Sequence, residues 1–367
     1  MFYLIFGTMP GKNFTVFIQR LFADYKIPIM LDLLKNQTCI LDLPEECLLL
    51  IFENLDQKDL IACSNVCKQW QDTVVMNRSL WKAIKLQSDF HVRKNVGISR
   101  FAATTKEYDT CSFANRRIVQ FLVRHDIHPD SIMIKYPSLD TRTHDTLSLL
   151  ISSGCCHRLT SCAIKWCEDW NFSDSDEFAT DLSHFLSIMS LLKEYTGISL
   201  HRMKTQLIWT AESVRHICEF KQLSHIELNA FPRVQCVYRS NIEKLLDALQ
   251  NLESLKLTVT VMPKFAERFS FKSESLLSLD ISDCVNFFIE EMHLPNLHTF
   301  CAVNIQCHRM ALFLHTFCLH TVLRNGCPRL RYIHSGPADK TGNHASAPSS
   351  AKGRICFCHE HRKSDIS

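Results

Sequence analysis

Between residues 40 and 86, apolar residues recur every three or four positions in three successive runs, and this spacing predicts three short helices. The first helix begins near Pro44, because a proline there lacks an N–H that would be unpaired anyway. Glu45 and Glu46 follow at the positive end of the helix dipole. Helices this short expose more apolar surface than they bury in each other, so we expect them to pack on a partner, on the following domain, or on both. The apolar positions are Leu48, Ile51, Phe52 and Leu55, then Leu60, Ile61 and Val66, then Cys67, Trp70, Val74 and Val75.

A second pattern, L-x-x-L-x-L, appears from residue 159 onward and is typical of the short strand of a leucine-rich repeat. Segments with helical spacing lie between the copies, at residues 178–189, 242–249 and 311–324. A strand and a returning helix in each repeat predict an α/β solenoid, because no single repeat buries its own apolar face. A generic α/β domain in which the leucine spacing arises by chance is the alternative. The copies, some of them degraded, begin at Leu159, Leu223, Leu252, Leu276, Leu297 and Leu330.

These patterns divide the chain into four parts. We expect residues 1–38 to be a mobile N-terminal segment, 39–88 to be the three-helix unit, and 89–335 to be the repeat domain. Residues 336–367 are rich in Gly, Ser, Pro and Ala at their start and predict a flexible tail. The fold class that we predict is therefore α/β, with a three-helix unit followed by an irregular leucine-rich-repeat solenoid.

Composition narrows the class of protein. A hydrophobic fraction of 46% with 22% charged residues is typical of a folded soluble protein. The net charge of +3 does not indicate a nucleic-acid surface, and no apolar run is long enough to predict a membrane span. The 18 cysteines, many within apolar stretches, indicate buried reduced thiols in a cytoplasmic or nuclear protein.

The candidate chemistry is sparse. Cys356, Cys358, His359 and His361 form a cluster near the C-terminus, but Cys-x-Cys is tighter than the usual spacing of zinc ligands. We therefore expect a solvated tail there and predict neither a metal nor a cofactor. The sequence contains no phosphate-binding loop, Gly-x-Ser-x-Gly or His-Glu-x-x-His motif, and no Cys/His pair stands out as catalytic.

The first stretch resembles the F-box family. The resemblance implies a substrate-recognition adaptor, which is not itself an enzyme, in an SCF (Skp–cullin–F-box) ubiquitin ligase. The F-box would dock on the Skp-family subunit, and through it on the cullin and RING subunits, while the repeats hold a protein substrate. The alternatives are a scaffold outside the ligase and an enzyme with one unusually reactive thiol. The matching positions are Leu43-Pro44, Ile51-Phe52, Leu55, Leu60, the block Val66-Cys67-Lys68-Gln69-Trp70, and Leu80-Trp81.

Two sets of binding residues follow from these expectations. The contacts with the Skp-family subunit that we predict are Leu43, Pro44, Glu46, Ile51, Leu55, Leu60, Val66 and Trp70. In L-x-x-L-x-L the third, fifth and seventh residues face away from the core by strand alternation, so we expect them to line a concave substrate surface. They are His225, Glu227, Asn229, Ser254, Lys256, Thr258, Ser278, Asp280 and Ser282.

Overall fold

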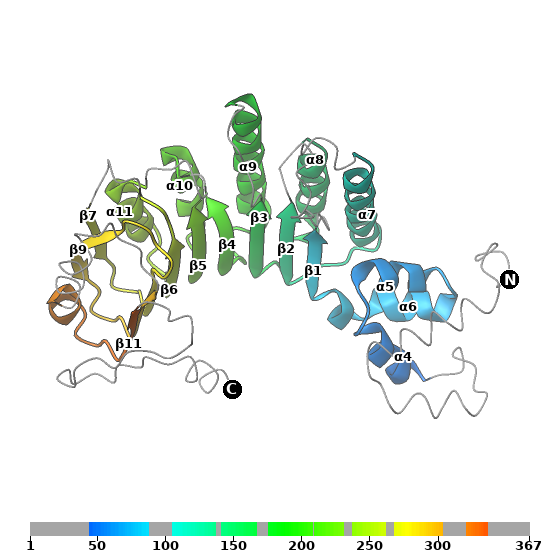
Figure 1. The fold of residues 1–367 in the computed structure, drawn as a ribbon. Helices are drawn as coiled ribbons and strands as arrows, with labels where there is room; N and C mark the ends of the chain where they lie inside the picture. The colour runs from blue at the N-terminus through cyan, green and yellow to red at the C-terminus, as the bar shows by residue number, and fades with distance from the viewer. Residues whose placement is uncertain are drawn as a thin grey trace.

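The computed structural model describes residues 44–87, 105–136, 141–166, 175–207, 209–230, 237–261, 268–303 and 321–336. In this part of the chain, three short helices precede a long parallel sheet whose strands form a curved row, with helices along one side of it (Figure 1). The expectations for residues 1–38, for Leu43, for the tail after residue 336 and for its Cys/His cluster concern residues outside these ranges.

The three predicted N-terminal helices are present as α4 (Glu45–Phe52), α5 (Gln57–Ser64) and α6 (Lys68–Met76). They pack through the predicted apolar positions, and the ring of Phe52 lies edge-on to that of Trp70 with centroids 5.3 Å apart. Asp56 begins α5, because its carboxylate accepts a hydrogen bond of 2.9 Å from the Asp59 N–H.

The sheet has nine parallel strands within the described residues, and each pairs with its neighbours in chain order. The strand of every predicted L-x-x-L-x-L copy is present. Three further strands depart from the leucine template. Trp81 and Pro129 stand at its leading position before β1 and β2, and Thr205 stands at its last position in β4. The strands are β1 (Ala83–Gln87), β2 (Ser131–Tyr136), β3 (Ser161–Trp166), β4 (Arg202–Leu207), β5 (His225–Ala230), β6 (Ser254–Thr258), β8 (Ser278–Asp280), β10 (Thr299–Val303) and β11 (Tyr332–Gly336).

Helices cover one side of the sheet over its first part. The predicted helix at 178–189 is confirmed within α9, and the one at 242–249 matches α11 except that α11 ends at Ala248. Of the third, 311–324, only residues 321–324 are described, and they are helical. The described helices of this layer are α7 (Thr105–Arg124), α8 (Thr141–Leu150), α9 (Ser175–Thr196), α10 (Ala211–Cys218) and α11 (Arg239–Ala248).

The prediction of a returning helix in every repeat is wrong between β6 and β10, whereas residues 321–326 before β11 are helical. There the outer layer contains a second, two-stranded parallel sheet, β7 (Arg268–Lys272) and β9 (Phe288–His293), with β7 beside α11. The reason is the period of the side chains, because Phe269 and Phe271 alternate with polar residues, as in a strand. The ring of Phe269 stacks on that of Phe287 at a centroid distance of 4.1 Å.

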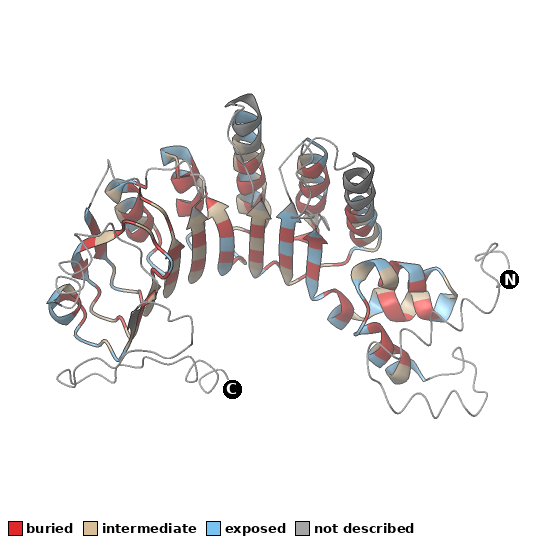
Figure 2. Cartoon of the chain, in the orientation of Figure 1, coloured by how far each residue is buried: buried red, intermediate tan, exposed pale blue. Residues whose placement is uncertain are grey.

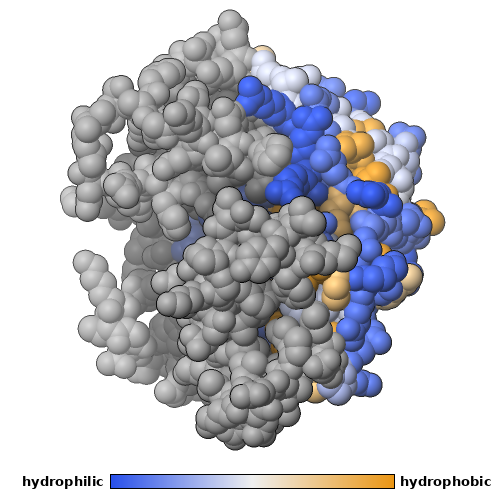
Figure 3. All heavy atoms as spheres, turned by 90° about the vertical axis from the view of Figure 1, so that its right-hand side faces the viewer, coloured by the Kyte–Doolittle hydropathy of each residue, from blue (hydrophilic) through white to orange (hydrophobic). Residues whose placement is uncertain are grey.

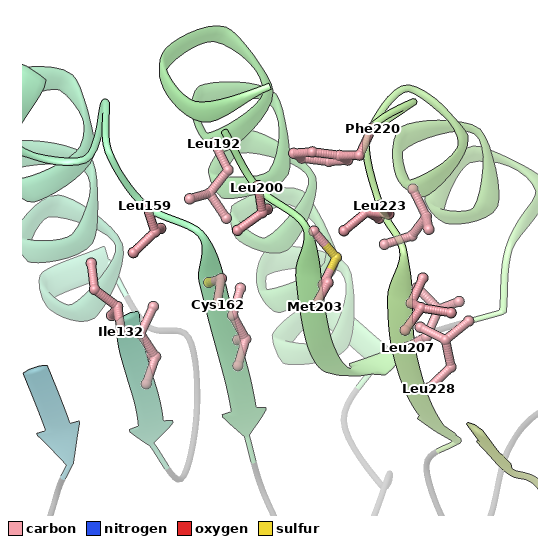
Figure 4. Packing of buried hydrophobic residues seen from close by; sticks show 14 of the residues in the cluster. Ile132, Leu159, Cys162, Leu192, Leu200, Met203, Leu207, Phe220, Leu223 and Leu228 are labelled. Carbon is pink, nitrogen blue, oxygen red and sulfur yellow. The ribbon is translucent and has the colours of Figure 1, made fainter. Parts of the chain in front are cut away.

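The core lies between the sheet and its outer layer. Figure 4 shows strand residues such as Ile132, Cys162 and Met203 pointing into the same layer as Leu192 from α9. The leading leucines before β3, β5, β6, β8 and β10 are fully buried, as Leu159 is, whereas Leu330 before β11 is half-buried. Buried positions alternate with more exposed ones along strands such as β1, β4 and β6 (Figure 2), so each of these strands has one face in the core and one facing outward.

The helical unit joins the sheet directly. The turn η2 (Arg78–Trp81) leads from α6 into β1, so the sheet begins within the segment 39–88 that the sequence assigns to the helical unit. Trp81 is fully buried, and its Nε1–H donates a hydrogen bond of 2.7 Å to the Val74 carbonyl of α6. Its ring lies 5.3 Å from that of Phe121 in α7, and Arg78 forms an ion pair with Asp130 just before β2.

Replacement of Trp81 by phenylalanine tests this junction. The smaller ring leaves a cavity and leaves the Val74 carbonyl without its donor, so we expect a loss of about 1–3 kcal/mol in the free energy of unfolding. The control is Met76→Ala at a side chain that is 77% exposed, which we expect to change stability by less than about 0.5 kcal/mol. Equal effects of the two substitutions in urea unfolding would show that Trp81 does not hold the junction together.

Candidate interaction surfaces

The helical unit keeps most of its predicted contact residues in its own core. Ile51, Leu60 and Trp70 are at most 4% exposed, and Leu55 is 9% exposed, so in this conformation these side chains pack inside the chain. Leu43 lies outside the described residues.

Three predicted contact residues lie at the surface of the helical unit. Pro44 and Glu46 are exposed at the start of α4, and Val66 is half-buried between α5 and α6. Only residues at the surface contact a partner without rearrangement, so these three are the direct candidates in the described part of the unit.

Two large apolar side chains are exposed on the helical unit and were not among the predicted contacts. Leu50 in α4 is 60% exposed and Met76 at the end of α6 is 77% exposed. Asn77 Nδ2 donates to the Glu45 carboxylate at 3.4 Å, which ties the end of α6 to the start of α4. The sequence could have predicted an exposed apolar residue here, because residues 48–52 are all apolar and a helix can bury only one face of such a run.

The surface on the side of the molecule that carries the helical unit contains both apolar and hydrophilic residues. Figure 3 shows apolar side chains among hydrophilic ones on this side.

The outward face of the sheet carries the second predicted set. Eight of its nine residues, all except Ser282, are half-buried on this face. Ser282 is 7% exposed and serves the loop after β8: its N–H donates to Asp280 Oδ1 at 2.9 Å, and its Oγ accepts from the Val303 N–H at 3.1 Å. Ser282 is therefore a structural residue, and its assignment to an open binding surface is wrong.

Charges on this face form a row of alternating sign across four strands. Lys204, Glu227, Lys256 and Asp280 occupy successive register positions in β4, β5, β6 and β8. Lys204 Nζ lies 2.8 Å from the Glu227 carboxylate, and Lys256 Nζ lies 3.9 Å from Glu227 and 3.8 Å from Asp280. The row largely neutralises itself, so the β5–β8 part of the face has no strong charge of one sign.

His225 lies beside this row. Burial lowers the pKa of its imidazole, and the nearby Arg202 lowers it further. Its Nδ1 is 2.9 Å from the Ser224 hydroxyl. The ring is therefore neutral at pH 7 and adds a hydrogen-bonding group, not a charge, to the outward face.

The described residues contain no group of three or more His, Cys, Asp or Glu side chains placed to hold a metal ion. Among the helices in the described ranges, none combines the length and the hydropathy that a membrane span requires.

Comparison with protein families finds a match to the F-box-like family over residues 40–87. No curated protein matches the chain at a significant level. The matched segment contains α4, α5, α6, η2 and β1, and so ends with the first strand of the sheet. Its fold is the three-helix unit together with that strand, and the chain therefore contains an F-box-like domain at residues 40–87.

Proposed function

We propose that this chain is a substrate-recognition subunit of an SCF-type ubiquitin ligase. The observation that carries the proposal is the F-box-like match over a folded three-helix unit with exposed apolar side chains. F-box domains generally bind Skp-family proteins. In this proposal the Skp-family subunit covers Leu50 and Met76, together with Pro44, Glu46 and Val66, and connects the chain to the cullin and RING subunits.

We further propose that the parallel sheet is a divergent leucine-rich-repeat array that binds a protein substrate. Nine parallel strands in chain order and the recurring six-residue spacing support this interpretation. The outward face of the sheet is the substrate surface in this proposal.

The contribution of the chain to ubiquitin transfer is then positional. The turn η2 connects α6 to β1 without an intervening linker, and the buried Trp81 contacts both units. A substrate on the sheet would therefore be held at a defined distance and orientation from the ligase core, which raises its effective concentration at the ubiquitin-loaded enzyme. The covalent chemistry would belong to other subunits.

Substitution of Leu50 tests the docking role. A carboxylate in an apolar contact loses its hydration without gaining a partner, so we expect Leu50→Glu to weaken capture of the purified Skp-family subunit at least about tenfold. The matched control is Ile198→Glu, because Ile198 is 87% exposed and lies between α9 and β4, away from the helical unit. Wild-type capture by Leu50→Glu, with both variants folded, would contradict the proposed docking surface.

The reactivity of the thiols tests the proposal that the chain is not an enzyme. Burial raises the pKa of Cys63, Cys162 and Cys284 to about 12, which keeps these thiols protonated and unreactive. At pH 8 we expect a thiolate fraction on the order of 10⁻⁴, and so negligible alkylation by iodoacetamide in the native chain. Mass spectrometry of the urea-unfolded chain is the control, where the same cysteines should react fully. Rapid alkylation of one of them in the native chain would favour a nucleophilic thiol.

A further inference from the structure

The charged side chains on the outward face of the first four strands are all basic. The outward positions alternate with buried residues such as Ile84, Ile132, Cys162 and Met203. None of the outward positions of these four strands holds an acidic or an aromatic residue. The charged residues at these positions are Lys85 in β1, Lys135 in β2, Lys165 in β3, and Arg202 and Lys204 in β4, which together we call the β1–β4 basic face.

The strand register places these cations next to one another. Lys135 and Lys165 are direct register partners on adjacent parallel strands. Like charges at such positions repel each other, and an anionic ligand would reduce that repulsion. Among the described residues, Lys85 and Lys135 form no ion pair, and both side chains are exposed.

Two apolar side chains, those of Met133 and Ala163, lie between the charged residues of this face. In one register row Lys85 pairs with Met133, Met133 with Ala163, and Ala163 with Lys204. Met133 is 43% exposed and Ala163 is half-buried. Adjacent strands lie about 4.8 Å apart, so the two lysines at the ends of this row are separated by about 14 Å along the sheet.

We infer that the β1–β4 basic face binds an acidic, extended segment of the substrate polypeptide. An extended chain rises about 3.3 Å per residue, so about five residues span the row from Lys85 to Lys204. Glutamate or aspartate side chains would accept hydrogen bonds from the ammonium groups of Lys85 and Lys135, whereas Lys204 keeps its ion pair with Glu227. An apolar side chain of the segment would cover Met133. This inference rests on the proposed function and adds to it the chemical class of the substrate.

The surface fits a polypeptide better than a nucleic acid. Single-stranded nucleic acids are usually held by aromatic side chains on which bases stack, and the outward positions of β1–β4 have none. The charge of the face is also local, because Glu227 pairs with Lys204 at the edge of the face and Asp280 pairs with Lys256 beyond it. A short acidic segment is the ligand whose size and charge match this limited surface.

The test measures peptide binding by two charge-reversed variants of the full-length chain. The probe is a fluorescein-labelled peptide of alternating glutamate and alanine, followed by fluorescence anisotropy. Lys85→Glu/Lys135→Glu changes the basic face. The matched control, Arg116→Glu/Arg117→Glu, makes the same change in net charge at exposed positions of α7.

We expect the wild-type chain to bind the peptide, with an affinity that falls between about 50 and 200 mM NaCl. The Lys85→Glu/Lys135→Glu variant should bind about tenfold more weakly, and the control within about twofold of wild type. Absence of binding by the wild type, or equal losses in both variants, would overturn the inference. Tighter binding of an oligothymidylate of equal charge would also overturn it, in favour of a nucleic acid.

Capture of the Skp-family subunit by the same variants is measured in parallel. We expect capture to be unchanged in both, because neither pair of substitutions touches Leu50 or Met76. Absence of peptide binding with normal capture by the wild type counts against the acidic segment alone. Failure of the wild-type chain to capture the subunit counts against the proposed function.

Discussion

The buried indole of Trp81 is the contact on which the rest of the structure depends. Its N–H donates to the Val74 carbonyl in α6, its ring packs near Phe121 in α7, and its backbone leads into β1. A helical unit of this size buries little surface alone, and β1 gains a partner only in β2. The F-box-like domain and the sheet therefore complete each other's core.

The core of the sheet is built from the same short pattern of apolar residues in successive strands. From β1 to β6, the leading residue and the two inward positions of each strand fill the layer between sheet and helices, so the outward positions of these strands have little part in core packing. Those positions differ along the sheet: basic on β1–β4, and alternating in sign from Lys204 to Asp280. A regular core thus presents an irregular surface, which is the arrangement that selective binding of a partner needs.

Much of this fold could be predicted from the spacing of apolar residues, because burial of one strand face repeats with each turn of the chain. The leucine template missed β2 because Pro129 stands where leucine was expected, and it missed β1 because Trp81 does. It also predicted helices where Phe269 and Phe271 form a strand. The basic face was not predicted either. Without β1 and β2, the sequence alone does not show that Lys85 and Lys135 lie on the same face of one sheet.

The exposed residues of the helical unit were harder to predict than its fold. Apolar periodicity marks Ile51, Leu60 and Trp70 as important, but it does not separate a side chain packed inside the unit from one that meets a partner. Both need an apolar residue on one face of a helix. Only the packing of α4, α5 and α6 shows that these three residues are buried and that Leu50 and Met76 are exposed.

Affinity purification of the chain from cells, with cullin neddylation blocked and unblocked, tests the adaptor function most directly when it is followed by mass spectrometry. If the chain is an adaptor, a Skp-family subunit and a cullin should co-purify with it, and further proteins should accumulate in the purified complex when the ligase is blocked. Because the β1–β4 face is basic, those proteins should contain acidic segments. Recovery of neither ligase subunit would contradict the adaptor function and leave the sheet as a binding module outside the ligase.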